Sequence, residues 1–211
     1  MMNVAPDSGY EFTNDWFGQN IPVWDQLIPR FQPTKFLEIG SYEGRSTCYL
    51  IEKFAALGRI EIHCIDTWEG GVEHDKSTMS DVERRFDKNT ALANQKTNNQ
   101  ALITKHKKYS NLALADLIAA RQLLKFDVVY VDGSHQAPDV LMDCVMSFQL
   151  LRSGGLMIFD DYIWTMEALG KQDAFNMPKP AIDAFLNIFQ RKMQIVRGAP
   201  VYQLYAAKVG T

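Results

Sequence analysis

Short runs of β-branched and aromatic residues alternate along the chain with longer stretches in which apolar residues recur at helical spacing. The apolar runs predict strands at 35–40, 60–66, 101–107, 126–132, 154–160, 192–198 and 200–209. The amphipathic stretches predict a turn leading into a helix over 41–57 and further helices at 81–94, 111–124, 137–151 and 180–190. Such alternation is typical of βαβ units and a parallel sheet. A short turn at 198–200 predicts an antiparallel last pair of strands. We therefore expect an α/β fold with seven mostly parallel strands, helices on both faces and an antiparallel last strand.

The chain has 211 residues, 46% of them hydrophobic, which suits one globular domain better than two. Residues 1–34 lie outside the strand pattern and contain several aromatics and prolines, so we read them as an N-terminal segment that precedes a domain at 35–211. This segment either caps the active site or forms a homodimer interface, and we favour the first. The stretches 67–80 and 163–178 follow strands and are predicted to be loops or lids.

Composition excludes several classes of partner. A net charge of -3 creates no basic field for nucleic acid or an anionic membrane, so a small molecule is the expected partner. The N-terminus lacks the pattern of a signal peptide, and no stretch approaches the roughly 20 apolar residues of a membrane span. These features predict a soluble, cytoplasmic protein. Cys48, Cys64 and Cys144 are far apart in apolar segments, which predicts buried reduced thiols.

The first strand ends in a glycine-containing turn, EIGSYEGRS, with Gly40 and Gly44 on either side of the strand-to-helix junction. Glycine there lets a ligand approach the backbone and the helix N-terminal amides. Ser41 and Tyr42 replace the second glycine of a GxGxxG dinucleotide fingerprint. The turn therefore favours a nucleoside without phosphates and argues against an NAD-dependent oxidoreductase.

From about residue 35 to 208 the chain resembles the class I S-adenosylmethionine-dependent methyltransferases, which have a Rossmann-like sheet. The resemblance implies that the first motif consists of Glu38, Gly40, Ser41 and Gly44. It implies that Asp66, in CIDTW, accepts hydrogen bonds from the ribose hydroxyls. The cofactor site implied by the resemblance also includes Thr67, Trp68, Tyr109, Ser110 and Asp132, with Tyr109 and Ser110 at the adenine. Ser110 alternatively caps the following helix, and Glu38 alternatively pairs with a lysine.

Two predicted neighbouring strands end on carboxylates, the first on Asp132 and the second on Asp160 and Asp161. Neighbouring strands lie about 4.8 Å apart, so the three side chains can converge. Clustered carboxylates repel one another unless a cation is present. Oxygen ligands suit Mg²⁺, with Mn²⁺ or Ca²⁺ as alternatives, better than zinc. This set resembles that of the metal-dependent O-methyltransferases of the catechol, caffeoyl-CoA and macrolide-sugar types.

His135 lies three residues after Asp132, where the catechol-type enzymes have a lysine base. A neutral histidine can accept a proton near pH 7, so the predicted catalytic residues are His135 and Asp132. The predicted reaction is methylation of a hydroxyl on a sugar, natural product or catechol-like molecule. The alternatives are a metal-independent methyltransferase, in which His135 or a carboxylate acts alone, and a non-catalytic nucleoside-binding scaffold. For the individual residues, His135 alternatively belongs to a turn and the Asp-Asp pair to a solvated loop.

Overall fold

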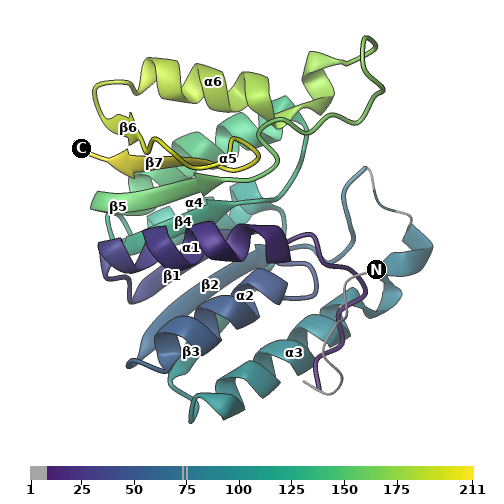
Figure 1. The fold of residues 1–211 in the computed structure, drawn as a ribbon, viewed down its shortest axis with the longest axis vertical. Coiled ribbons are helices and arrows are strands. Elements are labelled where there is room, and N and C mark those ends of the chain that lie inside the picture. Colours follow the sequence, from purple (N-terminus) through teal and green to yellow (C-terminus); the bar gives the residue numbers. More distant parts are fainter. Residues whose placement is uncertain (1–8, 73, 75) are drawn as a thin grey trace.

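The computed structural model describes residues 9–72, 74 and 76–211. Its centre is a seven-stranded sheet with the order β3-β2-β1-β4-β5-β7-β6 (Figure 1). The strands are β1 (Lys35–Ile39), β2 (Ile60–Asp66), β3 (Ala101–Lys107), β4 (Phe126–Val131), β5 (Leu151–Phe159), β6 (Met193–Ile195) and β7 (Leu204–Lys208). Strands β1 to β5 pair in parallel, and β7 is antiparallel to both β5 and β6. The predicted α/β class and the antiparallel last pair are confirmed.

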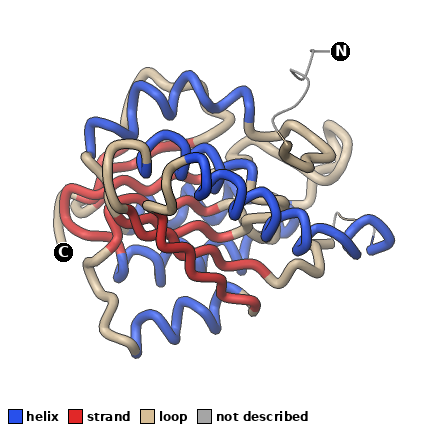
Figure 2. The backbone as a smooth tube through the Cα atoms, turned by 90° about the horizontal axis from the view of Figure 1, so that it is seen from below, coloured by secondary structure: helices blue, strands red, loops and turns tan. Residues whose placement is uncertain are grey.

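Helices cover both faces of the sheet (Figure 2). They are α1 (Ile21–Leu27), α2 (Arg45–Leu50), α3 (Val82–Lys96), α4 (Ser110–Ala119), α5 (Ala137–Leu150) and α6 (Pro178–Ile188). Shorter helical turns occur at Gly18–Asn20, Ile28–Phe31, Ile51–Ala55, Lys76–Asp81 and Ala174–Asn176. None of the helices in the described part of the chain is long and apolar enough to cross a membrane.

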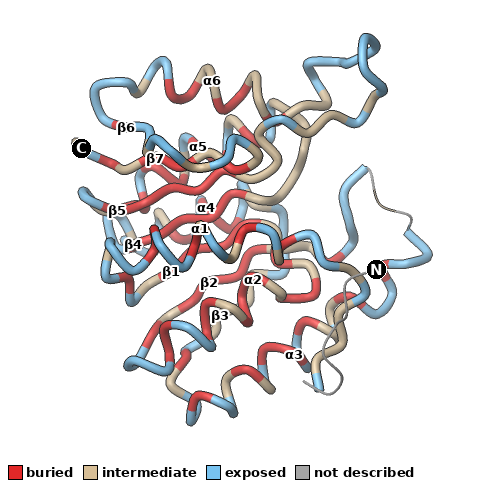
Figure 3. Tube along the Cα trace, viewed as in Figure 1, coloured by how far each residue is buried: buried red, intermediate tan, exposed pale blue. Residues whose placement is uncertain are grey.

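Each face of the sheet has its own hydrophobic core, because neighbouring strand residues point to opposite sides. In β1, Phe36 belongs to the core beneath α1, α2 and α3, whereas Leu37 belongs to the core beneath α4, α5 and α6. The central strands are therefore buried along their length (Figure 3), which explains their nearly continuous apolar sequence. The three cysteines are buried and free, as predicted.

Several predicted boundaries were wrong. The helix predicted to reach residue 124 ends at Ala119, because Arg121 and Leu124 adopt left-handed backbone angles that no helix continues. Strand β5 begins at Leu151, three residues before the predicted start at 154. The tight turn predicted at 198–200 is part of a longer connection, 196–203, between the short strand β6 and β7.

The carboxyl ends of the parallel strands share one edge of the sheet, on the right in Figure 1. The described parts of the segments 67–80 and 163–178 project on this side, as does the chain from residue 9 to α1. Open α/β sheets bind ligands at this edge. Of the predicted N-terminal segment, residues 1–8 lie outside the described residues.

Candidate active site

The turn after β1 is held against the ends of two other strands. The backbone N–H of Gly40 donates to Ile65 O of β2 (2.8 Å), and that of Asp132, after β4, donates to Ile39 O (2.8 Å). Gly40 has φ +83°, and a Cβ there would overlap the Asp132 carbonyl oxygen. Only glycine therefore fits where β1 and β4 converge.

Asp66 shapes the same turn. One of its oxygens accepts the backbone N–H groups of Ser41 (2.9 Å) and Tyr42 (2.8 Å), and the other accepts that of Trp68 (2.7 Å). A carboxylate has about four lone-pair positions, so three contacts leave room for a further donor. Acceptance of a ribose hydroxyl by Asp66 remains a prediction.

Glu38 is fully buried beneath the turn. Its carboxylate accepts the hydroxyl groups of Ser41 (2.8 Å), Ser46 and Thr47. Burial raises the pKa of Glu38 above its usual range, and the three hydroxyl groups act in the opposite direction. Glu38 thus joins the end of β1 to the first turn of α2 through hydroxyl partners.

The other predicted cofactor residues differ in exposure. Trp68 is buried, donates its indole N–H to Tyr42 O (2.9 Å) and packs on Phe86, so it supports the turn from below. Thr67, beside it, accepts the backbone N–H of Glu69 (3.2 Å). Tyr109 precedes α4 and is 67% exposed, so its ring is available to a ligand.

Gly44 precedes α2 and has φ +79°. A Cβ there would lie 3.0 Å from the Phe86 ring, so packing against α3 also favours glycine. Ser110 is the first residue of α4 and provides no helix cap. Its side chain instead lies close enough to the buried Asp143 carboxyl on α5 to lower the pKa of that group, which burial raises.

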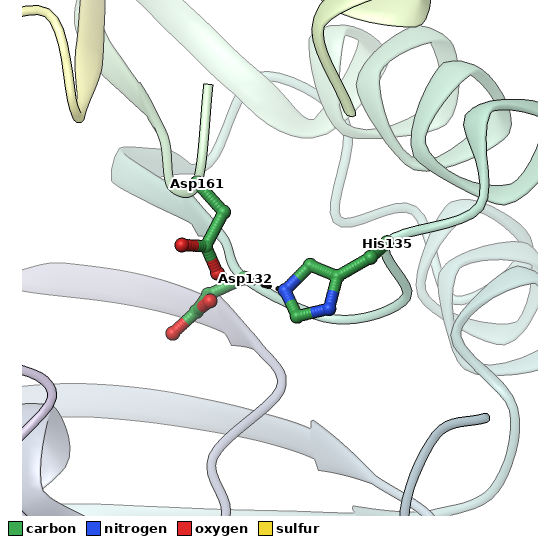
Figure 4. Close-up of side chains that lie close together, drawn as sticks. All are labelled: Asp132, His135 and Asp161. Carbon is green, nitrogen blue, oxygen red and sulfur yellow. Dashed lines mark hydrogen bonds and ion pairs between the residues drawn. The ribbon is translucent and has the colours of Figure 1, made fainter. Parts of the chain in front are cut away.

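Two of the three carboxylates predicted to bind a metal, Asp132 and Asp161, lie together with His135 in the loops after β4 and β5 (Figure 4). Ligand atoms of these three side chains all lie within 4.8 Å of one another. His135 Nε2 lies 2.7 Å from Asp161 Oδ2. Asp161 has φ +52°, a left-handed conformation that gives it a different direction from Asp160.

Asp160, the third predicted carboxylate, is held by other partners. Its Oδ2 accepts the Tyr130 hydroxyl and the Gln203 side-chain amide (2.8 Å), and its Oδ1 accepts the backbone N–H of Asp161 (2.8 Å). Tyr130 also contacts Asp132 Oδ2 (2.9 Å). Asp160 is therefore linked to Asp132 through Tyr130, while Asp161 faces His135.

The acidic groups raise one another's pKa values. Burial raises the pKa of Asp132 well above its usual range, and the charges of Asp160 and Asp161 raise it further. Burial also raises the pKa of Asp160, with a smaller contribution from Asp161. A bound cation would relieve this repulsion between carboxylates.

Aromatic side chains surround the His135–Asp161 pair. The Trp164 ring stacks on the His135 ring at 4.3 Å between centroids, and the Trp164 backbone N–H donates to Asp161 O (2.9 Å). Burial raises the pKa of the Tyr202 hydroxyl, and the nearby Asp161 carboxylate raises it further. Trp164 is thus at the site, whereas the Tyr162 hydroxyl donates to Asp183 on α6 (2.7 Å).

Sequence reasoning missed Tyr130, Gln203 and Tyr202. Tyr130 carried a signal: it places a hydroxyl group among the valines of β4, two residues before Asp132 and so on the same side of the strand. Gln203 and Tyr202 lie in a connecting segment whose path the sequence pattern did not reveal.

The strand order, the reversed β7, the turn after β1 and the carboxylate after β2 together define the class of S-adenosylmethionine-dependent methyltransferases. A family model described as "Methyltransferase domain" matches residues 37–162. The chain belongs to this methyltransferase family. No curated protein matches the chain.

Solved structures share the fold at low sequence identity. An O-methyltransferase from Bacillus cereus, in complex with S-adenosylhomocysteine, has 16% identity and a TM-score of 0.63 over 93% of this chain and 84% of that one. The O-methyltransferase TomG from Streptomyces achromogenes, in complex with S-adenosylmethionine, has 16% identity and a TM-score of 0.55 over 89% and 78%. MycE of the mycinamycin biosynthetic pathway, in complex with Mg and S-adenosylhomocysteine, has 20% identity and a TM-score of 0.57 over 93% of this chain and 51% of that one.

Proposed function

We propose that this protein transfers a methyl group from S-adenosylmethionine to a hydroxyl oxygen of a small molecule, with a divalent cation, preferably Mg²⁺, at the carboxylates. The observation that carries the proposal is the convergence of Asp132, His135 and Asp161 at the carboxyl ends of β4 and β5. The O-methyltransferase structure from Bacillus cereus and the structure of the methyltransferase MycE, which contains Mg, support it.

The donor set fits a hard cation. Asp132 and Asp161 offer carboxylate oxygens, which suit Mg²⁺ and Mn²⁺, and the nearby imidazole of His135 is better tolerated by Mn²⁺. Asp160 would add a third carboxylate close by, beside Asp132 at the Tyr130 hydroxyl. Asp132, Asp160 and Asp161 would hold the cation, as the sequence predicted.

For the cofactor, the turn after β1 and Asp66 form the binding edge. Asp66 retains capacity for a ribose hydroxyl, and the exposed Tyr109 ring offers a surface on which adenine can stack. Gly40 and Gly44 keep the backbone of the turn free of side chains at the two points where it bends.

When bound, the cation lowers the pKa of a hydroxyl group, and S-adenosylmethionine offers a methyl group on a positively charged sulfur. His135 then accepts the hydroxyl proton on a ring nitrogen. Asp161 orients the ring through its 2.7 Å contact and stabilises the resulting imidazolium. Trp164 stacks on the ring, which limits its rotation and excludes water from one face.

We also propose that the N-terminal segment caps the cofactor side of the site. The backbone N–H and hydroxyl of Thr13 donate to Glu43 in the turn after β1 (2.7 and 2.8 Å). The Trp16 ring lies 5.2 Å from that of Tyr42. These contacts place residues 13–16 against the turn that would receive the cofactor.

Calorimetric titration with S-adenosylhomocysteine tests the cofactor site. We expect micromolar binding that Asp66→Ala removes, whereas Asp87→Ala, an exposed carboxylate on α3, binds normally. Absence of binding to folded wild-type protein would contradict the proposal.

Methyl transfer to catechols and to hydroxylated sugars tests the metal requirement. We expect EDTA to abolish activity and Mg²⁺ to restore it, and Asp161→Ala to be inactive even with excess Mg²⁺. Full activity in EDTA would favour the metal-independent alternative and leave the methyltransferase assignment intact.

A further inference from the structure

A chain of buried hydrogen bonds connects the N-terminal helix α1 to the acidic site. The Trp24 indole N–H donates to Gln203 Oε1 (2.8 Å), and the Tyr205 hydroxyl donates to the same oxygen (2.6 Å). Gln203 Nε2 donates to Asp160 Oδ2 (2.8 Å) and approaches the Tyr130 hydroxyl at 3.4 Å. Trp24 and Gln203 are 0% and 2% exposed, so water does not compete for these contacts.

Trp24 fixes which groups donate and which accept in this series of hydrogen bonds. An indole N–H can only donate, so Gln203 must turn its carbonyl oxygen toward Trp24 and its amino group toward Asp160. A flipped amide would face an N–H with an NH₂ and a carboxylate with a carbonyl oxygen. Burying such unsatisfied groups is costly, about 1–3 kcal/mol each. Gln203 is therefore an obligatory donor to Asp160.

Donors around Asp160 then fix the carboxylate beside it. Gln203 and Tyr130 bind one of its oxygens, and the backbone N–H of Asp161 binds the other. The Tyr130 hydroxyl, held in this way, also contacts Asp132 Oδ2 (2.9 Å). The orientation of Asp132 toward Asp161 and His135 thus depends on residues that lie behind the site.

We propose that Trp24 and Gln203 are positioning residues for the cation site: through Asp160 and Tyr130 they hold Asp132 in the orientation that binds the ion. This inference rests on the proposed metal-dependent function. Both residues lie outside 37–162, the part of the chain that the family model matches.

Titration with Mn²⁺ alone, followed by electron paramagnetic resonance, tests the proposal without any acceptor. Trp24→Phe removes the donor that orients the Gln203 amide, and Gln203→Met removes the donor to Asp160. Residues that orient metal ligands typically change metal affinity about 10- to 100-fold, so we expect each variant to bind Mn²⁺ at least about 10-fold more weakly. S-adenosylhomocysteine affinity without metal should stay within about twofold of wild type.

Tyr205→Phe is the matched control, because it removes the second donor to Gln203 Oε1 but leaves Trp24 to orient the amide. We expect its Mn²⁺ affinity to stay within about twofold of wild type, even where its Tm falls. In a Gln203→Met background, Trp24→Phe should cause no further loss of Mn²⁺ affinity, since both act through one link.

If the loss of Mn²⁺ affinity in all three variants is proportional to their loss of Tm, the proposal is overturned. The hydrogen-bond chain then has only a structural role. The proposal would also be overturned if the losses of Mn²⁺ affinity caused by Trp24→Phe and Gln203→Met add up in the double variant. Wild-type protein that binds S-adenosylhomocysteine but not Mn²⁺ would refute the metal-dependent function, and the positioning role with it. If the wild type binds Mn²⁺ and both Trp24→Phe and Gln203→Met bind Mn²⁺ with the same affinity as the wild type, the positioning role alone is refuted. Should Trp24→Phe fail to fold, Gln203→Met decides the result.

Discussion

Replacing Asp143 by asparagine should change how stability depends on pH. Asp143 lies on α5 with 1% of its surface exposed. Among the described residues, its Oδ1 has no hydrogen-bond partner. Burial raises the pKa of Asp143 to about 7. Asparagine has the same shape and cannot ionise, so it mimics the protonated carboxyl.

The expected size follows from the two pKa values. In the unfolded chain the carboxyl has an ordinary pKa of about 3.9, so the difference is about 3 units, or up to about 4 kcal/mol at 1.36 kcal/mol per unit. Because the folded state holds the proton more tightly, this contribution to stability is present at low pH. It is lost as the pH rises from about 4 to about 7. The wild type should therefore lose stability relative to Asp143→Asn over this range.

Urea unfolding at pH 4.5, 5.5, 6.5 and 7.5 measures this difference. The other buried acids ionise in both proteins and cancel in the subtraction, and any fixed cost of burying the asparagine amide shifts the difference equally at each pH. Asp87→Asn, which removes an exposed carboxylate on α3, controls for the loss of one carboxylate. If the stability difference between wild type and Asp143→Asn is flat from pH 4.5 to 7.5, the reasoning is refuted.

Three further predictions concern stability. Gly40→Ala should cost at least about 3 kcal/mol and abolish S-adenosylhomocysteine binding, because its methyl group would overlap the Asp132 carbonyl at a left-handed φ; Tm and calorimetry test this. Lys208→Met should cost about 1–3 kcal/mol in urea unfolding, since the buried ammonium donates to two carbonyls at the end of α5 (2.6 and 2.8 Å). Burial lowers the pKa values of His63 and His106, whose rings are joined at 2.9 Å. The folded state therefore favours neutral rings and loses stability as the pH falls below about 6.5. Between pH 7.5 and 5.5, the Tm of His63→Gln should therefore fall by less than the Tm of the wild type.

The fold was largely predictable because its central strands are buried on both faces and so carry a continuous apolar sequence. The boundaries at the sheet's antiparallel edge were less predictable. There β6 has only three residues, and Ile195 is 46% exposed, so the apolar pattern extends beyond the paired residues. The segment 196–203 resembles a strand in composition but serves to carry Tyr202 and Gln203 to the acidic site.

The candidate site was predictable to the extent that its residues end strands. Asp132 and Asp161 follow β4 and β5 closely, and parallel pairing brings them together. The orientation of neighbouring residues was not predictable, because the left-handed backbone at Asp161 decides which carboxylate of the pair faces His135. Likewise, nothing in the local sequence shows that both oxygens of Asp66 already bind backbone amides.

The domain matched by the family model, residues 37–162, and the segments that flank it contribute different groups to the acidic site, and hydrogen-bond geometry explains why. The domain matched by the family model supplies Asp132 and Asp160, but their carboxylates need donors to be held in one orientation inside a partly buried, mutually repulsive cluster. Tyr130 supplies one hydroxyl for two carboxylates, so a further donor is required. Gln203 provides it, and Trp24, from the opposite end of the chain, fixes which way Gln203 faces. The carboxylates of the acidic site are therefore oriented only when both terminal segments are folded onto the sheet. A loss of structure in either segment would change the geometry of the site.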